Sequence, residues 1–175
     1  QAQQVQTEPI SVVSPKKGEC IAANTGYTIK WTSQQPGPDH MAIGFSHLGQ
    51  DLGPWKDNQI NYFTATAPDT GSYVWTTPNR TTETGKLTIE GQLVDGSVWG
   101  TGTSQLFSLD ANPPAKPLLS IIQSTSSTVT LSWNKSEDLG CAGLVGYKLY
   151  RNDVLVKSFE PTSTQAIVEN VPTDR

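Results

Sequence analysis

Short segments in which apolar and polar residues alternate recur along the whole chain, and turn residues separate them. In residues 27–32, Tyr27, Ile29 and Trp31 alternate with polar residues, so a strand would place these three side chains on one face. No segment shows convincing helical periodicity, and we therefore predict an all-β fold. The predicted strands are residues 10–14, 27–32, 41–46, 61–65, 72–76, 86–94 and 105–109, then 118–123, 128–133, 145–151, 154–159 and 165–168.

Composition agrees with many short strands joined by turns. Hydrophobic residues make up 35% of the chain and charged residues 16%, against about 45–50% and about 25% in an average soluble domain. Thr, Ser, Gly, Pro and Asn make up the difference. The net charge is −4, and no basic block is present that would predict a nucleic-acid partner. No apolar run approaches the ~20 residues that span a bilayer, so we expect no membrane span in this segment.

A proline-rich segment divides the chain. Residues 110–117 (DANPPAKP) contain three prolines, which disfavour a central strand and favour an extended spacer. We predict an N-terminal extension at 1–9, a first sandwich at 10–109, a linker at 110–117 and a second, incomplete sandwich at 118–175. The fold class that follows is two tandem immunoglobulin-like β-sandwiches, the second lacking its last strands.

The first sandwich carries, in order, SPxxG at 14–18, GYTIKW at 26–31, GSYVWTTP at 71–78 and SxxF at 104–107. With these motifs, residues 10–109 resemble the N-terminal immunoglobulin-like domain of fungal Ser/Thr-rich, GPI-anchored cell-wall proteins, which also occurs in bacterial and protist surface proteins. That family has no known catalytic residues. The resemblance implies a structural role in a cell wall or at a cell surface.

The second sandwich begins at Pro113-Pro114 and carries TVTLSW at 128–133 and GYKLYR at 146–151. It resembles a fibronectin type III domain, but that family has two further strands after this point. We therefore expect the core residues Trp133, Tyr147, Leu149 and Ile167 to be partly exposed, although the strand register of Trp133 alone predicts burial.

The missing strands have two alternative sources: further sequence of the chain, or a neighbouring subunit that donates a strand. The candidate donor is the N-terminal extension, residues 1–9 (QAQQVQTEP). Donation would join copies head to tail into an open homopolymer. The weakness of this hypothesis is that Ala2 and Val5 are the only residues of the segment suited to fill a groove.

Several features predict a secreted, extracellular glycoprotein. The chain begins at Gln1, as after removal of a signal peptide. Asn79 and Asn134 begin N-glycosylation sequons beside turn residues. Cys20 and Cys141 lie in different sandwiches, and two alternatives stay open for them. Either they are unpaired within this sequence, or they form an inter-domain or inter-subunit disulfide.

The motifs of catalysis are not found, and we predict that the chain is not an enzyme and holds no cofactor or metal. His40 and His47 are seven residues apart, so a strand would point them to opposite faces. Asp51, Asp57 and Asn58 could offer oxygen ligands to calcium, but they match no known calcium loop.

Two tryptophans are candidates for binding. Trp55 and Trp99 fall in predicted loops, where an aromatic ring can stack on a sugar or cover the end of its own sandwich. The function that we expect is an extracellular structural subunit of a surface fibre, filament or cell-wall layer. The alternative is an adhesin, or a glycan-binding or spacer module of a larger secreted protein.

Overall fold

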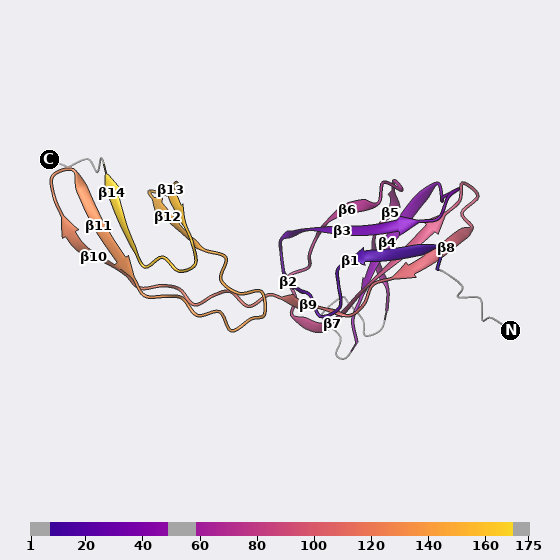
Figure 1. The fold of residues 1–175 in the computed structure, drawn as a ribbon, viewed down its shortest axis with the longest axis horizontal. Coiled ribbons are helices and arrows are strands. Elements are labelled where there is room, and N and C mark those ends of the chain that lie inside the picture. Colours follow the sequence, from indigo (N-terminus) through magenta and orange to yellow (C-terminus); the bar gives the residue numbers. More distant parts are fainter. Residues whose placement is uncertain (1–7, 49–58, 170–175) are drawn as a thin grey trace. The chain divides into compact units, whose positions relative to one another are not determined.

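A computed structural model describes residues 8–48 and 59–169, and every regular element in these residues is a β-strand (Figure 1). The all-β prediction is confirmed. The chain divides into two compact units, Gln1–Ala111 and Asn112–Arg175, and residues 110–117 span the boundary. None of the residues described belongs to a helix long and apolar enough to cross a bilayer.

Residues 8–48 and 59–111 of the first unit contain nine strands. They are β1 (Ile10–Ser14), β2 (Cys20–Ala22), β3 (Gly26–Ser33), β4 (His40–Ser46), β5 (Asn61–Ala67), β6 (Ser72–Thr76), β7 (Thr82–Gln92), β8 (Val98–Thr103) and β9 (Phe107–Asp110).

Two sheets of the first unit pack face to face. One has the order β1-β3-β6, and the other has the order β2-β9-β7-β4-β5. The long strand β7 pairs with β4 on one side, and on its other side it pairs first with β9 and then with β8. Alternate residues of each sheet point inward, as Ile29 and Trp31 do from β3 and Ile43 does from β4. These side chains enclose one apolar core, as expected for an immunoglobulin-like sandwich.

Two strands of the first unit were not predicted. Residues 96–102 (GSVWGTG) lie outside the predicted strands, and Trp99 was predicted to lie in a loop, but Val98–Thr103 is a strand that pairs with β7. Its glycines have a packing role, because a Cβ at Gly102 would overlap the carbonyl oxygen of Ile10 in β1. The other unpredicted strand, β2, has three residues and lies parallel to β9. It is too short to show an alternating pattern.

Pro9 belongs to the first unit rather than to a free extension. Its carbonyl oxygen accepts a hydrogen bond from the backbone N–H of Gln34 at 3.0 Å. Its ring lies where a Cβ of Gly100 would otherwise be. The predicted extension at 1–9 is therefore too long at its C-terminal end, and residues 1–7 lie outside the described part of the chain.

The described part of the second unit, residues 112–169, contains five strands. They are β10 (Leu119–Ser124), β11 (Thr128–Trp133), β12 (Tyr147–Arg151), β13 (Val154–Phe159) and β14 (Gln165–Glu169). Figure 1 shows the sheet β10-β11-β14 beside the hairpin β12-β13. The hairpin turns at Asn152 and Asp153, whose φ angles of 49° and 62° fit a two-residue primed turn.

The core of the second unit is small. Leu131, Trp133 and Ala166 are its buried apolar residues, with partly buried neighbours from both sheets. Trp133 is 7% exposed, so the prediction that it would be partly exposed is wrong, whereas Ile167 is 64% exposed as expected. Trp133 is covered because the rings of Tyr147 and Phe159 pack against it.

Candidate functional site

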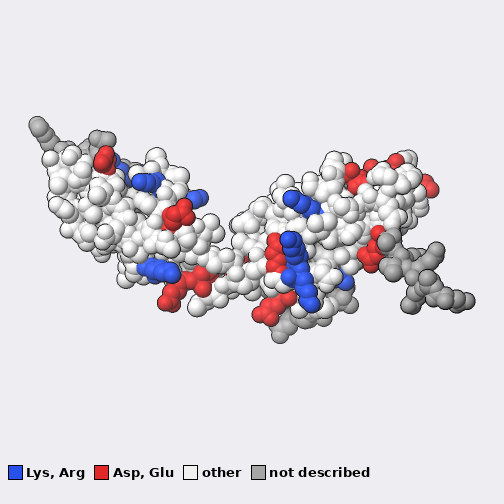
Figure 2. All heavy atoms as spheres, in the orientation of Figure 1, with Lys and Arg blue, Asp and Glu red and all other residues white. Residues whose placement is uncertain are grey.

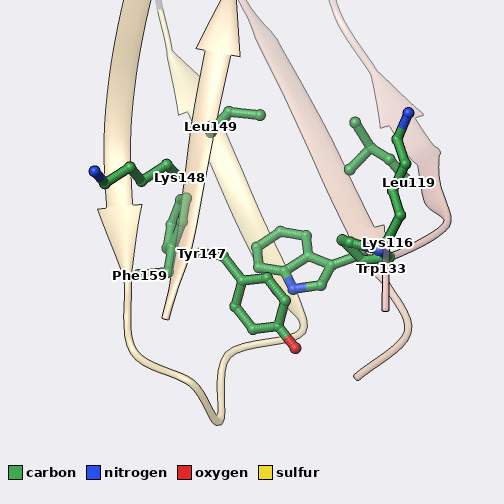
Figure 3. A pocket seen from close by; sticks show the side chains of 8 residues that line it. Lys116, Leu119, Trp133, Tyr147, Lys148, Leu149 and Phe159 are labelled. Carbon is green, nitrogen blue, oxygen red and sulfur yellow. The ribbon is translucent and has the colours of Figure 1, made fainter. Parts of the chain in front are cut away.

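An apolar groove of about 300 Å³ opens between the two sheets of the second unit (Figure 3). Its lining comes from the segment before β10 and from strands β10 to β13. The lining residues are Lys116, Pro117, Leu119, Trp133, Tyr147, Lys148, Leu149 and Phe159.

Three aromatic rings form one end of the groove. The ring of Trp133 lies 5.5 Å from that of Tyr147 and 5.3 Å from that of Phe159, with interplanar angles of 60° and 58°. The backbone N–H of Ser136 donates to the Tyr147 hydroxyl at 2.9 Å, which fixes that ring. Packed aromatic rings make a rigid apolar surface for another side chain.

One polar group in this aromatic cluster lacks a partner. The indole nitrogen Nε1 of Trp133 is buried and donates no hydrogen bond. In Figure 3 it lies on the side of the indole ring that faces Tyr147. Leaving such an N–H buried and unpaired costs about 1–3 kcal/mol.

Beside the groove, β12 has an open backbone edge. Among the described strands β12 pairs with β13 alone, through register pairs such as Tyr147 with Phe159 and Arg151 with Val154. No described strand pairs with the opposite edge of β12, and the backbone N–H and C=O groups of that edge could pair with a further strand. Such an edge is a template for pairing with another segment.

Strand β10 shows that the inner face is not covered. Leu119 and Ile121 pair in register with Trp133 and Leu131, so they share the inward face of the sheet. Even so, Leu119 is 56% exposed and Ile121 is 67% exposed. A further strand that lay over this face would reduce the exposure of both side chains.

The groove is not strongly charged. Figure 3 shows the side chain of Lys116 running along the rim beside Leu119, and the side chain of Lys148 pointing away from the groove. On the face drawn in Figure 2, Lys and Arg lie near Asp and Glu, and most of the surface is uncharged. Apolar burial and backbone hydrogen bonds are therefore the interactions that this site offers.

The tryptophans chosen from the sequence have other surroundings. Trp99 lies in β8, not in a loop, and packs half-buried against the first core and close to Gly91. The basis for Trp99 as a binding residue is therefore wrong. Trp55 lies outside the described residues, as do Asp51, Asp57 and Asn58.

The predicted glycosylation sites are both at the surface. Asn79 is exposed after β6, and Asn134 is exposed after β11. The side-chain oxygen of Asn134 accepts a hydrogen bond from the backbone N–H of Leu118, and Ser136 of the same sequon is buried. Glycosylation at either position stays a prediction.

The two cysteines of the chain, Cys20 and Cys141, are both disulfide-bonded, so neither offers a free thiol. The two histidines have different environments. His40 Nε2 lies 3.1 Å from the side-chain oxygen of Gln92. His47 is buried, and its Nε2 has no hydrogen-bond partner.

Sequence reasoning identified Tyr147 and Leu149 as incompletely covered but did not recognise a groove. It missed Phe159, Leu119 and Lys116 altogether. The usable signal was the number of strands predicted in residues 118–175. With fewer strands than a fibronectin type III domain, part of one inner face was expected to stay open, and the lining residues lie on the strands that flank the groove.

No family model matches the chain. Among solved structures, the fibronectin(III)-like modules of CbhA from Clostridium thermocellum are similar, at 13% sequence identity and a TM-score of 0.39. The match covers 93% of this chain and 79% of that chain. The assignment of both units as β-sandwiches rests on their own sheets and cores.

Proposed function

We propose that this chain is an extracellular structural subunit of a surface fibre, filament or cell-wall layer, and that it joins its neighbours through the second unit. The disulfide-bonded cysteines support an oxidising compartment. The resemblance of residues 10–109 to the immunoglobulin-like domain of cell-wall proteins supports a location at a cell surface.

The observation that carries the proposal is the groove next to the unpaired edge of β12. A strand added there would gain backbone hydrogen bonds from β12 and would cover Leu119 and Ile121, which are exposed on the inner face. Strand addition is an established mode of peptide recognition, in which backbone pairing gives affinity and side-chain pockets give specificity.

The donor in this proposal is the N-terminal segment of the next copy. Because Pro9 is held in the first unit, residues 1–8 are the part that can be donated. The donor precedes the first unit and the acceptor lies in the second unit, so the contact joins two different surfaces. Contacts of this kind produce open chains when they do not close into a ring.

Light scattering across a concentration series, with negative-stain microscopy, tests the proposal. The full chain is expected to increase in mass with concentration and to form filaments. A chain lacking residues 1–7 is expected to stay monomeric, as is a control in which Gly and Ser replace those residues at equal length. Assembly of either variant at the same concentrations as the full chain would contradict strand donation.

The glycan-binding alternative draws no support from Trp99, because that side chain packs against the core of its own unit. An assay for it should use Trp55→Ala on a glycan array.

A further inference from the structure

The chemistry of the groove sets requirements for the strand that enters it. The lining is almost wholly apolar, so the entering face needs an apolar side chain to exclude water from Trp133, Tyr147 and Leu149.

The two faces of the N-terminal segment differ in these properties. Successive side chains of a strand point to opposite faces, so the odd-numbered and even-numbered residues separate. The odd face has Val5 between Gln3 and Thr7, which combines a branched apolar side chain with two acceptors. The even face has Ala2 as its only apolar side chain, followed by Gln4 and Gln6.

We infer that Val5 of one copy fills the groove of the next copy against Trp133, and that Gln3 and Thr7 lie on the same face of the donor strand on either side of it. This inference rests on the proposed function, because it assigns the residues of the same strand donation. The entering face needs a branched apolar side chain, and the odd face of the segment supplies one in Val5.

The opposite face of the donor would point to solvent. Gln4 directly precedes Val5, so it would lie at nearly the same point along the donor strand. Its side chain would point to the opposite face. A charge at position 5 would be placed in the groove, and the same charge at position 4 would stay in water. The pair therefore supplies a matched control.

The test measures the dissociation constant of subunit association for Val5→Leu, Val5→Asp and Gln4→Asp in the full chain, by sedimentation velocity over a concentration series. Val5→Leu is expected to bind about fourfold more tightly, because it buries one more methylene group. Val5→Asp is expected to weaken association by about 50-fold or more, because it buries a carboxylate with no partner. Gln4→Asp is expected to change it by less than about threefold.

The outcomes separate this inference from the proposed function. Equal weakening by Gln4→Asp and Val5→Asp would overturn the assignment of the faces. Unchanged association in all three variants would overturn the role of Val5, while the loss of assembly on deleting residues 1–7 would leave strand donation standing. Assembly without residues 1–7 would overturn both.

Discussion

Two glycines of β8 allow the two sheets of the first unit to approach closely at one corner. The backbone of Ile10 lies against Gly102, and the ring of Pro9 lies against Gly100. Neither glycine has a positive φ angle that would explain its presence. The requirement at these positions is space, and side chains in β8 would force β1 away from the core that Ile10 helps to fill.

Replacement of one of these glycines tests that explanation. Gly102→Ala is expected to destabilise the first unit by about 2 kcal/mol, because its Cβ would meet backbone atoms that cannot move aside. Gly26→Ala is the control, since its Cβ would make an ordinary contact at 3.7 Å with Val74. In calorimetry the Tm of the first unit should fall by about 8 °C for Gly102→Ala only. An equal fall for both variants would contradict the packing role.

Tyr27 makes the first unit sensitive to alkali. Burial raises the pKa of Tyr27 from 10.0 to about 12, and its hydrogen bond to Glu19 also raises it. The unfolded chain loses this proton near pH 10, and the folded chain keeps it up to about pH 12. The free energy of unfolding should therefore fall as the pH rises through this window.

The matching measurement is unfolding followed between pH 8 and pH 12 for the natural chain and for Tyr27→Phe. The variant should lose stability at neutral pH, because the bonds to Ser14 and Glu19 are removed. It should also show a shallower decline above pH 10. A decline of unchanged steepness would show that the proton on Tyr27 is not coupled to folding.

At the scale of elements, β10 and β11 pair with each other but differ in how much of their inner face is covered. Leu131 of β11 is 8% exposed, whereas its register partner Ile121 of β10 is 67% exposed. Ile121→Ser should therefore change the free energy of unfolding of the separate subunit by less than about 0.5 kcal/mol. Leu131→Ala should cost about 2–4 kcal/mol.

Calorimetry of dilute samples checks this contrast in the transition of the second unit. The same Ile121→Ser variant should assemble less well at high concentration, because the proposed donor strand would cover the side chain of Ile121. A large loss of stability in the dilute Ile121→Ser subunit would mean that β10 is already covered and that the sandwich is not open.

The alternating pattern was enough to locate most strands, because long strands with one buried face repeat every second residue. β1, β6, β11 and β13 have the predicted bounds, and other strands differ by a few residues at their ends. The pattern failed at β8, where glycines replace the inward side chains, and at β2, which is too short. Both failures arise from contacts with strands distant in sequence, which local periodicity does not record.

The groove could be anticipated only in outline. The second sandwich was predicted to have two strands fewer than a fibronectin type III domain, and an open inner face was expected from that difference. The sequence does not say which core residues of this sandwich remain covered. Trp133 is buried because Tyr147 and Phe159 close over it from the other sheet. The unpaired indole N–H is likewise a consequence of packing across the sandwich, and the alternation of residues 128–133 carries no information about it.

At the scale of the whole molecule, the number of free thiols tests whether both cysteines are disulfide-bonded. The native chain should show no thiols with a thiol-specific reagent, folded or denatured, and two after reduction. If the bridge lies within one chain, a non-reducing denaturing gel should show the monomer. A dimer that disappears on reduction would instead place the disulfide between subunits.

The proposed head-to-tail assembly assigns one role to each unit. The first unit has a closed core and precedes the second unit with the proposed donor segment at its start, and the second unit has the groove and the edge of β12 with which no described strand pairs. A subunit that lacks the donor can still accept a strand, so it should terminate chains when mixed with the full-length protein. The acceptor can therefore be examined in a soluble, non-polymerising variant.

Amide hydrogen exchange in β12 is the most direct test of strand addition. The chain lacking residues 1–7 would be measured with and without a saturating peptide of residues 1–9. Exchange at Tyr147–Arg151 should slow when the peptide is bound, because its backbone pairs with the free edge of β12, and exchange in the edge strands β5 and β6 should not change. Binding of the peptide with unchanged exchange in β12 would contradict strand addition at this edge.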